Sequence, residues 1–160
     1  MAEVSPPWLE VGQPVPDIPL TDDQGQPVRL SSFRGKKVVL YFYPADDTPG
    51  CTKEACSFRD RQSDFQKMGA VVLGVSPDGT ESHQKFKQKF QLNFPLLTDH
   101  DHLLASALGA WREKNNYGKK YFGIVRSTFI LDQEGRVQKL WKSVKVDGHE
   151  AKVLESLAAP

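Results

Sequence analysis

The stretch Lys37-Val-Val-Leu-Tyr-Phe-Tyr43 is a near-continuous apolar run, bounded by Gly35 and Pro44. Its β-branched and aromatic residues favour a strand, and the absence of polar alternation indicates burial on both faces. The stretch Ala70-Val-Val-Leu-Gly-Val-Ser76 repeats this pattern. We therefore predict that both segments are buried strands of a central sheet.

Between these strands the apolar period changes to three and four residues, which is the period of a helix. The residues that lie along one stripe at this spacing are Cys51, Ala55, Phe58, Gln62 and Phe65. This pattern predicts one helix over residues 48–68, ended by Gly69. A second, more polar helix is predicted over residues 80–91, where Phe86 and Phe90 lie four residues apart.

The flanking segments complete an α/β pattern. A small β-hairpin is expected near the N-terminus, with residues 28–30 as its second strand after a turn at residues 22–25. The expected later elements are a strand at 94–97, a helix at 103–108, strands at 127–132 and 136–141, and a helix at 148–158. The order indicates a mixed central β-sheet flanked by helices on both faces, consistent with a thioredoxin-like fold.

The composition is that of an ordinary folded protein. The 160 residues suit a single domain over residues 1–160, with 39% hydrophobic and 26% charged residues. A net charge of +1 lacks the electrostatic footprint that nucleic acid or an anionic membrane requires. Residues 1–12 do not resemble a secretory signal, and no apolar stretch is long enough to span a bilayer. We expect a cytoplasmic protein without nucleic-acid or membrane partners.

The segment that joins the first strand to the helix carries the most informative residues: Pro44-Ala-Asp-Asp-Thr-Pro-Gly-Cys51-Thr-Lys-Glu-Ala-Cys56. Thr48 followed by Pro49 is typical of an N-cap with proline at the first helical position, which places Cys51 in the first turn. Its sulfur then faces free backbone N–H groups and the positive end of the helix dipole. Such a setting favours the reactive thiolate, although a cysteine there can also be a small buried hydrophobe.

The spacing of the two cysteines constrains any bond between them. Cys56 follows Cys51 by five residues, so their α-carbons are about 8–9 Å apart in an intact helix. A disulfide requires about 7 Å or less. The pair can therefore form a bridge only if the first turns unwind, which favours a transient catalytic disulfide over a structural one.

Metal binding is a further use of paired cysteines. Zinc sites usually have closer cysteine spacing and two additional ligands. His100 and His102 are the only clustered histidines, and we interpret them as surface-loop residues. His83 and His149 are isolated in polar helical patterns and suggest no function. The sequence thus predicts no metal site.

The chain resembles the peroxiredoxins, whose signature is matched by Pro44, Thr48 and Cys51. The run over residues 41–60 is similar to the Q or bacterioferritin comigratory protein type, an atypical two-cysteine branch with this cysteine spacing. Residues 12–35 resemble the opening hairpin of the family, and residues 126–132 resemble its arginine-bearing strand. The resemblance covers nearly the whole chain.

This resemblance implies a thiol peroxidase that reduces hydrogen peroxide and organic hydroperoxides. Cys51 would become a sulfenic acid, and Cys56 would condense with it to form an intramolecular disulfide. Thioredoxin or a glutaredoxin would reduce the disulfide, and no organic or metal cofactor is implied. Relatives of this type also suggest a monomer.

The resemblance also implies roles for residues around the sulfur of Cys51. Thr48 would hydrogen-bond the peroxide, and Arg126 would stabilise the thiolate and the leaving oxygen. Pro44 would shield the sulfur from water, and Glu54 would hold Arg126. Two other functions remain open at this stage: a thiol–disulfide oxidoreductase acting on proteins, and a redox sensor that changes shape on oxidation.

Overall fold

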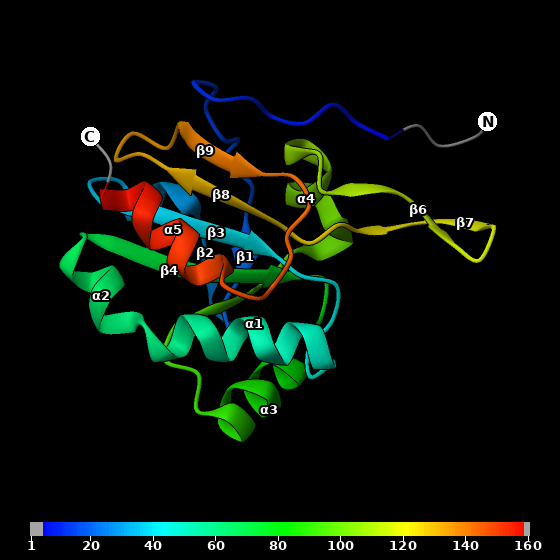
Figure 1. Ribbon diagram of the computed structural model, residues 1–160, viewed down its shortest axis with the longest axis horizontal. Helices are drawn as coiled ribbons and strands as arrows, with labels where there is room; N and C mark the ends of the chain where they lie inside the picture. The colour runs from blue at the N-terminus through cyan, green and yellow to red at the C-terminus, as the bar shows by residue number, and fades with distance from the viewer. Residues whose placement is uncertain (1–4, 159–160) are drawn as a thin grey trace.

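The computed structural model describes residues 5–158 (Figure 1). Within them, seven strands form one mixed sheet: β1 (Leu20–Thr21), β2 (Pro27–Val28), β3 (Lys37–Phe42), β4 (Ala70–Ser76), β5 (Leu96–Thr98), β8 (Ser127–Leu131) and β9 (Val137–Trp141). Their order across the sheet is β2-β1-β5-β4-β3-β8-β9. β3, β4 and β5 run parallel, whereas β8 runs antiparallel to β3. The predicted central strands are therefore confirmed.

Helices cover both faces of the sheet (Figure 1). One face carries α1 (Pro49–Asp60), α2 (Gln62–Lys67), α3 (Thr80–Phe90) and α5 (His149–Ala158). The other carries α4 (Leu103–Leu108) and the short 3₁₀ helix Leu30–Phe33. Alternate residues of β3 enter the two cores, Tyr41 on the α1 side and Phe42 on the α4 side. None of the helices in residues 5–158 is long and apolar enough to cross a membrane.

The single helix predicted over residues 48–68 is wrong in one respect, because the chain breaks at Arg61 between α1 and α2. Arg61 leaves the helical conformation with φ −113° and ψ 15°. The side-chain amide of Gln62 donates to the carbonyl of Phe58, and so replaces an N–H of the continuing helix. Phe65 keeps the spacing of the predicted stripe across the break and is fully buried in α2.

Two other predicted boundaries also shift. The second strand of the N-terminal hairpin is Pro27–Val28 rather than residues 28–30, because Leu30 already begins the 3₁₀ helix. The strand predicted at 94–97 is Leu96–Thr98, where it pairs with both β4 and β1. The other predicted helices and strands are found within one or two residues of their expected ends.

A second hairpin was not predicted from the sequence. β6 (Trp111–Asn116) and β7 (Lys119–Ile124) form a two-stranded arm that projects from the body of the molecule (Figure 1). Half of the residues in its two strands are exposed and only Ile124 is buried, so it has no alternation of apolar and polar residues. The sequence feature that marks this hairpin is the turn Tyr117-Gly118. Both of its residues have positive φ, as a two-residue hairpin turn requires.

The pairing of β3 with β8 brings the segment that follows β3 close to Arg126, which precedes β8. Phe42, at the end of β3, lies opposite Ser127, at the start of β8. Because the strands are antiparallel, the chain leaving β3 and the chain entering β8 meet at one edge of the sheet. This register brings Arg126 beside the start of α1.

Candidate active site

The first turn of α1 has the predicted backbone but not the predicted cap. Thr48 is the N-cap residue, proline follows it, and the N–H of Thr52 donates to the carbonyl of Thr48 over 2.8 Å. Cys51 therefore lies in the first turn, where backbone N–H groups have no partner within the helix. The Thr48 hydroxyl does not cap these groups and instead donates to the carbonyl of Ala45 over 3.0 Å.

Arg126 lies against the sulfur of Cys51. Its Nη2 is 3.2 Å from Cys51 Sγ, and the thiol is buried and free. Gly50 leaves room for this approach, because a β-carbon there would lie 3.2 Å from Nη2. Sequence reasoning missed Gly50, although its position next to Cys51 was a usable signal. The arrangement directs a permanent positive charge at the sulfur.

Glu54 holds the other side of the same guanidinium. Arg126 Nη1 donates to Glu54 Oε1 over 2.8 Å, while Glu54 is only 1% exposed. Burial raises the pKa of Glu54 to about 7, even though Arg126 favours its charged form. Burial lowers the pKa of Arg126, but Glu54 and Cys51 outweigh this effect and leave it above its usual value. Arg126 is thus the charged centre of the site.

Lys114 is a second cation that the sequence did not indicate. It lies on β6, and its Nζ donates to the carbonyl of Ile124 over 2.8 Å. Desolvation lowers the pKa of Lys114, and the charge of Arg126 lowers it further, whereas Cys51 opposes this shift. The projecting hairpin therefore adds positive charge within electrostatic range of the thiol.

The remaining predicted site residues lie on the same segment. Pro44 is half-buried at the start of the loop that connects β3 to α1. Cys56 is half-buried and free, and the intact helix α1 contains both cysteines. The structure therefore brings Cys51, Arg126 and Glu54 into contact but leaves Cys56 unbonded.

Two of the four histidines differ from their predicted surroundings. His83 and His149 are both buried, contrary to their placement in polar patterns. His102 stacks on Trp111 with ring centroids 3.6 Å apart, and His100 shares a hydrogen bond with the hydroxyl of Thr21. Residues 5–158 contain no cluster of three or more histidine, cysteine, aspartate or glutamate side chains that could hold a metal ion.

Comparison with known proteins identifies the family. A family model described as AhpC/TSA matches residues 11–140. The chain belongs to this family, as a peroxiredoxin. Peroxiredoxin Bcp of Bacillus subtilis is 53% identical over 149 residues, which are 93% of this chain and 95% of that protein. Solved peroxiredoxin Q of Xanthomonas campestris is 44% identical with a TM-score of 0.86, covering 93% of this chain and 94% of that one.

These similarities confirm the predicted peroxiredoxin Q type and its thioredoxin-like fold. A solved structure of the Xanthomonas campestris bacterioferritin comigratory protein, studied for its alkyl peroxide reduction activity, is also 44% identical with a TM-score of 0.86. It covers 93% of this chain and 95% of that one. This peroxiredoxin is accordingly a peroxidase with a cysteine-based mechanism, which uses peroxide substrates and thiol reductants.

Proposed function

We propose that Cys51 is the residue that attacks the peroxide. The observation that carries this proposal is the 3.2 Å contact between Arg126 Nη2 and Cys51 Sγ. A guanidinium at this distance favours the thiolate, which is the nucleophilic form of cysteine. The thiolate attacks one peroxide oxygen and the O–O bond breaks. Cys51 becomes a sulfenic acid, and the other oxygen leaves as water or an alcohol after taking up a proton.

Thr48 would bind the peroxide as a hydrogen-bond acceptor. Because its hydroxyl hydrogen is directed to the carbonyl of Ala45, the lone pairs of Thr48 Oγ1 remain available. They can accept the hydrogen of the incoming hydroperoxide. Arg126 would stabilise the negative charge on the departing oxygen, and Pro44 would limit the access of water to the sulfur.

Glu54 would act through Arg126. Its 2.8 Å ion pair with Nη1 fixes the guanidinium, so that Nη2 faces Cys51. Glu54 is thus assigned the role of orienting the arginine rather than touching the peroxide.

Cys56 would complete the cycle as the resolving residue. Its sulfur attacks the sulfenic sulfur of Cys51, water leaves, and a disulfide forms. Two cysteines five residues apart in α1 cannot bond unless the helix unwinds. Thioredoxin or a glutaredoxin would then reduce the disulfide by thiol exchange. We further propose that the chain acts as a cytoplasmic, single-domain monomer.

Cys51→Ser tests the assignment of the nucleophile. An alcohol does not ionise at neutral pH, so this variant should lose peroxide consumption and sulfenic acid formation. The measurement combines stopped-flow peroxide decay with mass spectrometry after dimedone trapping, and Cys56→Ser serves as the matched control. Peroxide consumption at the wild-type rate by Cys51→Ser would refute the proposal.

A further inference from the structure

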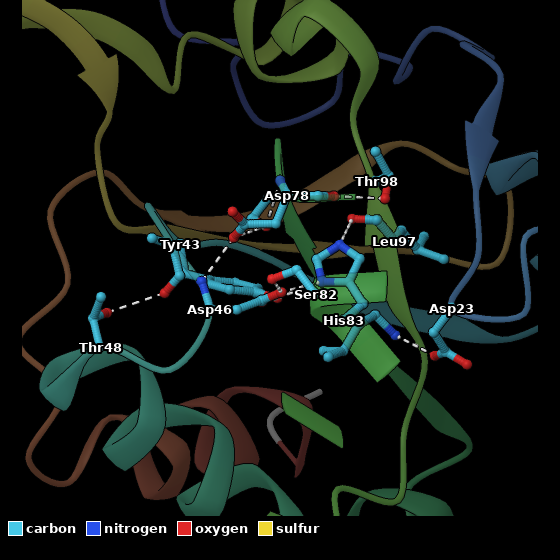
Figure 2. A network of polar contacts seen from close by, with 12 residues as sticks. Asp23, Tyr43, Asp46, Thr48, Asp78, Ser82, His83, Leu97 and Thr98 are labelled. Carbon is cyan, nitrogen blue, oxygen red and sulfur yellow. Dashed lines mark hydrogen bonds and ion pairs between the residues drawn. The ribbon is translucent and has the colours of Figure 1, made fainter. Parts of the chain in front are cut away.

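The loop over residues 44–48 contains a buried carboxylate that the proposed reaction does not use. The side chain of Asp46 is only 3% exposed. Three groups converge on it: the hydroxyl of Tyr43 at 2.6 Å, the hydroxyl of Ser82 at 2.8 Å and Nδ1 of His83 at 2.7 Å (Figure 2). Asp46 is therefore fixed from Tyr43, the residue directly after β3, and from α3.

His83 anchors this cluster in the core. It is fully buried on α3, and its Nε2 faces the carbonyl of Leu97 at 3.2 Å. Its Nδ1 faces Asp46, so both ring nitrogens point at hydrogen-bond acceptors. His83 and Asp46 therefore form a buried, hydrogen-bonded pair, and the histidine also contacts the backbone of β5. Such a pair fixes the loop to α3 and β5.

A second carboxylate fixes the backbone of the same loop. The peptide group between Ala45 and Asp46 donates its N–H to Asp78 Oδ2 over 2.7 Å. The carbonyl of this same peptide group accepts the hydroxyl hydrogen of Thr48. Because a peptide group is planar, Asp78 determines where that carbonyl points. The orientation of the Thr48 hydroxyl therefore depends on Asp78 (Figure 2).

Asp78 is itself held in place. Its Oδ2 accepts the hydroxyl of Ser76 over 2.9 Å, and its backbone carbonyl accepts the hydroxyl of Thr98 over 2.7 Å. The loop needs such support because Asp47 adopts a left-handed conformation with φ 55°, which is unfavourable for a non-glycine residue. Lys89 on α3 pairs with Asp47 over 2.8 Å.

We propose that Asp78, Asp46 and His83 are positioning residues, which hold the Thr48 hydroxyl in the orientation that accepts the hydrogen of the peroxide. This inference rests on the proposed function of Cys51 and Thr48. These three residues act on the loop before α1, whereas Arg126 acts on the sulfur. They should therefore control the peroxide step without changing the general reactivity of the thiol.

The test uses two substitutions of Asp78 and two reagents for Cys51. Asp78→Ala removes the acceptor, and a displacement of Thr48 should lower the rate constant for peroxide oxidation about 10- to 100-fold. Asp78→Asn keeps an acceptor oxygen and should restore most of the rate. Alkylation of Cys51 by iodoacetamide requires only the thiolate, so its rate and pH profile should be the same in both variants.

A double-mutant cycle with Thr48→Val distinguishes positioning from a general structural effect. If Asp78 acts through the Thr48 hydroxyl, adding Asp78→Ala to Thr48→Val should not slow peroxide oxidation any further, because that hydroxyl is already absent. Lys87→Gln is the control, because it removes the 3.0 Å pair with Asp23 from α3, the helix that carries His83, and leaves the loop intact. It should react with peroxide at the wild-type rate.

The outcomes separate the two proposals. If Cys51 of the wild-type protein is not oxidised by peroxide, the proposed function fails. If the wild type is oxidised, three results would overturn only the positioning role. Asp78→Ala could react with peroxide as fast as wild type, or it could lose peroxide oxidation and alkylation in parallel. It could also slow peroxide oxidation further when combined with Thr48→Val. Should Asp78→Ala not fold, Ser76→Ala removes one support of Asp78 and should give a smaller loss in the peroxide step alone. An unchanged rate in that variant would also contradict the role.

Discussion

Two buried carboxylates precede and follow Cys51 in the sequence, and their surroundings differ. Asp46, in the loop before α1, receives hydrogen bonds from Tyr43, Ser82 and His83. Glu54, in α1 itself, binds Arg126 through Oε1, while its buried Oε2 has no hydrogen-bond partner among residues 5–158. A buried polar atom without a partner costs free energy that a satisfied one does not.

This difference separates a part of the site that should stay in place from a part that should move. The loop before α1 is connected to α3 and β5 by the hydrogen bonds of Asp46 and His83. The first turns of α1 contain a half-satisfied carboxylate, which gains access to water when the helix unwinds. We infer that oxidation unwinds α1 while the loop keeps its conformation. Each prediction below tests one side of this contrast.

The largest effect concerns Cys56, on the side that should move. Cys56→Ser should retain the wild-type rate of the first oxidation of Cys51, because neither the loop nor Arg126 changes. Continuous turnover with thioredoxin should be lost, since the sulfenic acid has no resolving thiol. Single-turnover and steady-state measurements on one preparation test both statements. Loss of the first oxidation would show that the two functions are not divided in this way.

A pH-dependent effect on stability is expected at Glu54. Because burial raises its pKa from 4.5 to about 7, Glu54 stabilises the folded state below its unfolded pKa, and this stability is lost as the pH rises through about 7. Glu54→Gln stays neutral and keeps an acceptor for Arg126. As the pH rises from 4.5 to about 7, the free energy of unfolding of Glu54→Gln minus that of wild type should therefore increase by up to about 3 kcal/mol.

Urea denaturation of the reduced proteins at several pH values measures that difference. A constant difference between Glu54→Gln and wild type across the window would show that Glu54 is ionised throughout. The buried carboxylate would then not destabilise α1 at neutral pH.

The smallest effect should come from helix propensity between the two cysteines. Lys53 is exposed on α1, and its charged group pairs with Asp147. Lys53→Gly and Lys53→Ala both remove this pair but differ in helix stability by about 1 kcal/mol. If unwinding precedes the disulfide, the glycine variant should form it about fivefold faster. Equal rates of disulfide formation in quenched-flow experiments, with equal peroxide steps, would argue against unwinding.

The sequence predicted the central strands and the start of α1 because strong local signals coincide there. Residues 38–42 are apolar throughout, and the proline after Thr48 begins a helix. The break at Arg61 could not be predicted, because the helical spacing from Phe58 to Phe65 continues across it. The β6–β7 hairpin lacks an apolar face, and only its turn marks it.

Prediction of the candidate site from the sequence is limited in the same way, because tertiary structure brings its residues together. Cys51 and Cys56 are found by their spacing, and Arg126 only by resemblance, because the pairing of β3 with β8 brings it across 75 residues of sequence. His83 was judged to be isolated, although Phe86 and Phe90 follow it at helical spacing and mark a buried face. Its partner Asp46 lies 37 residues away, so the pair depends on tertiary structure.

Amide hydrogen exchange on the reduced and disulfide forms tests the central contrast most directly. After oxidation, confirmed by mass, exchange should become faster over residues 51–60. The amide of Asp46, which donates to Asp78 Oδ2, should keep its protection. Equal protection of residues 51–60 in both forms, or loss of protection at Asp46 together with α1, would contradict the account of a fixed loop beside a helix that unwinds.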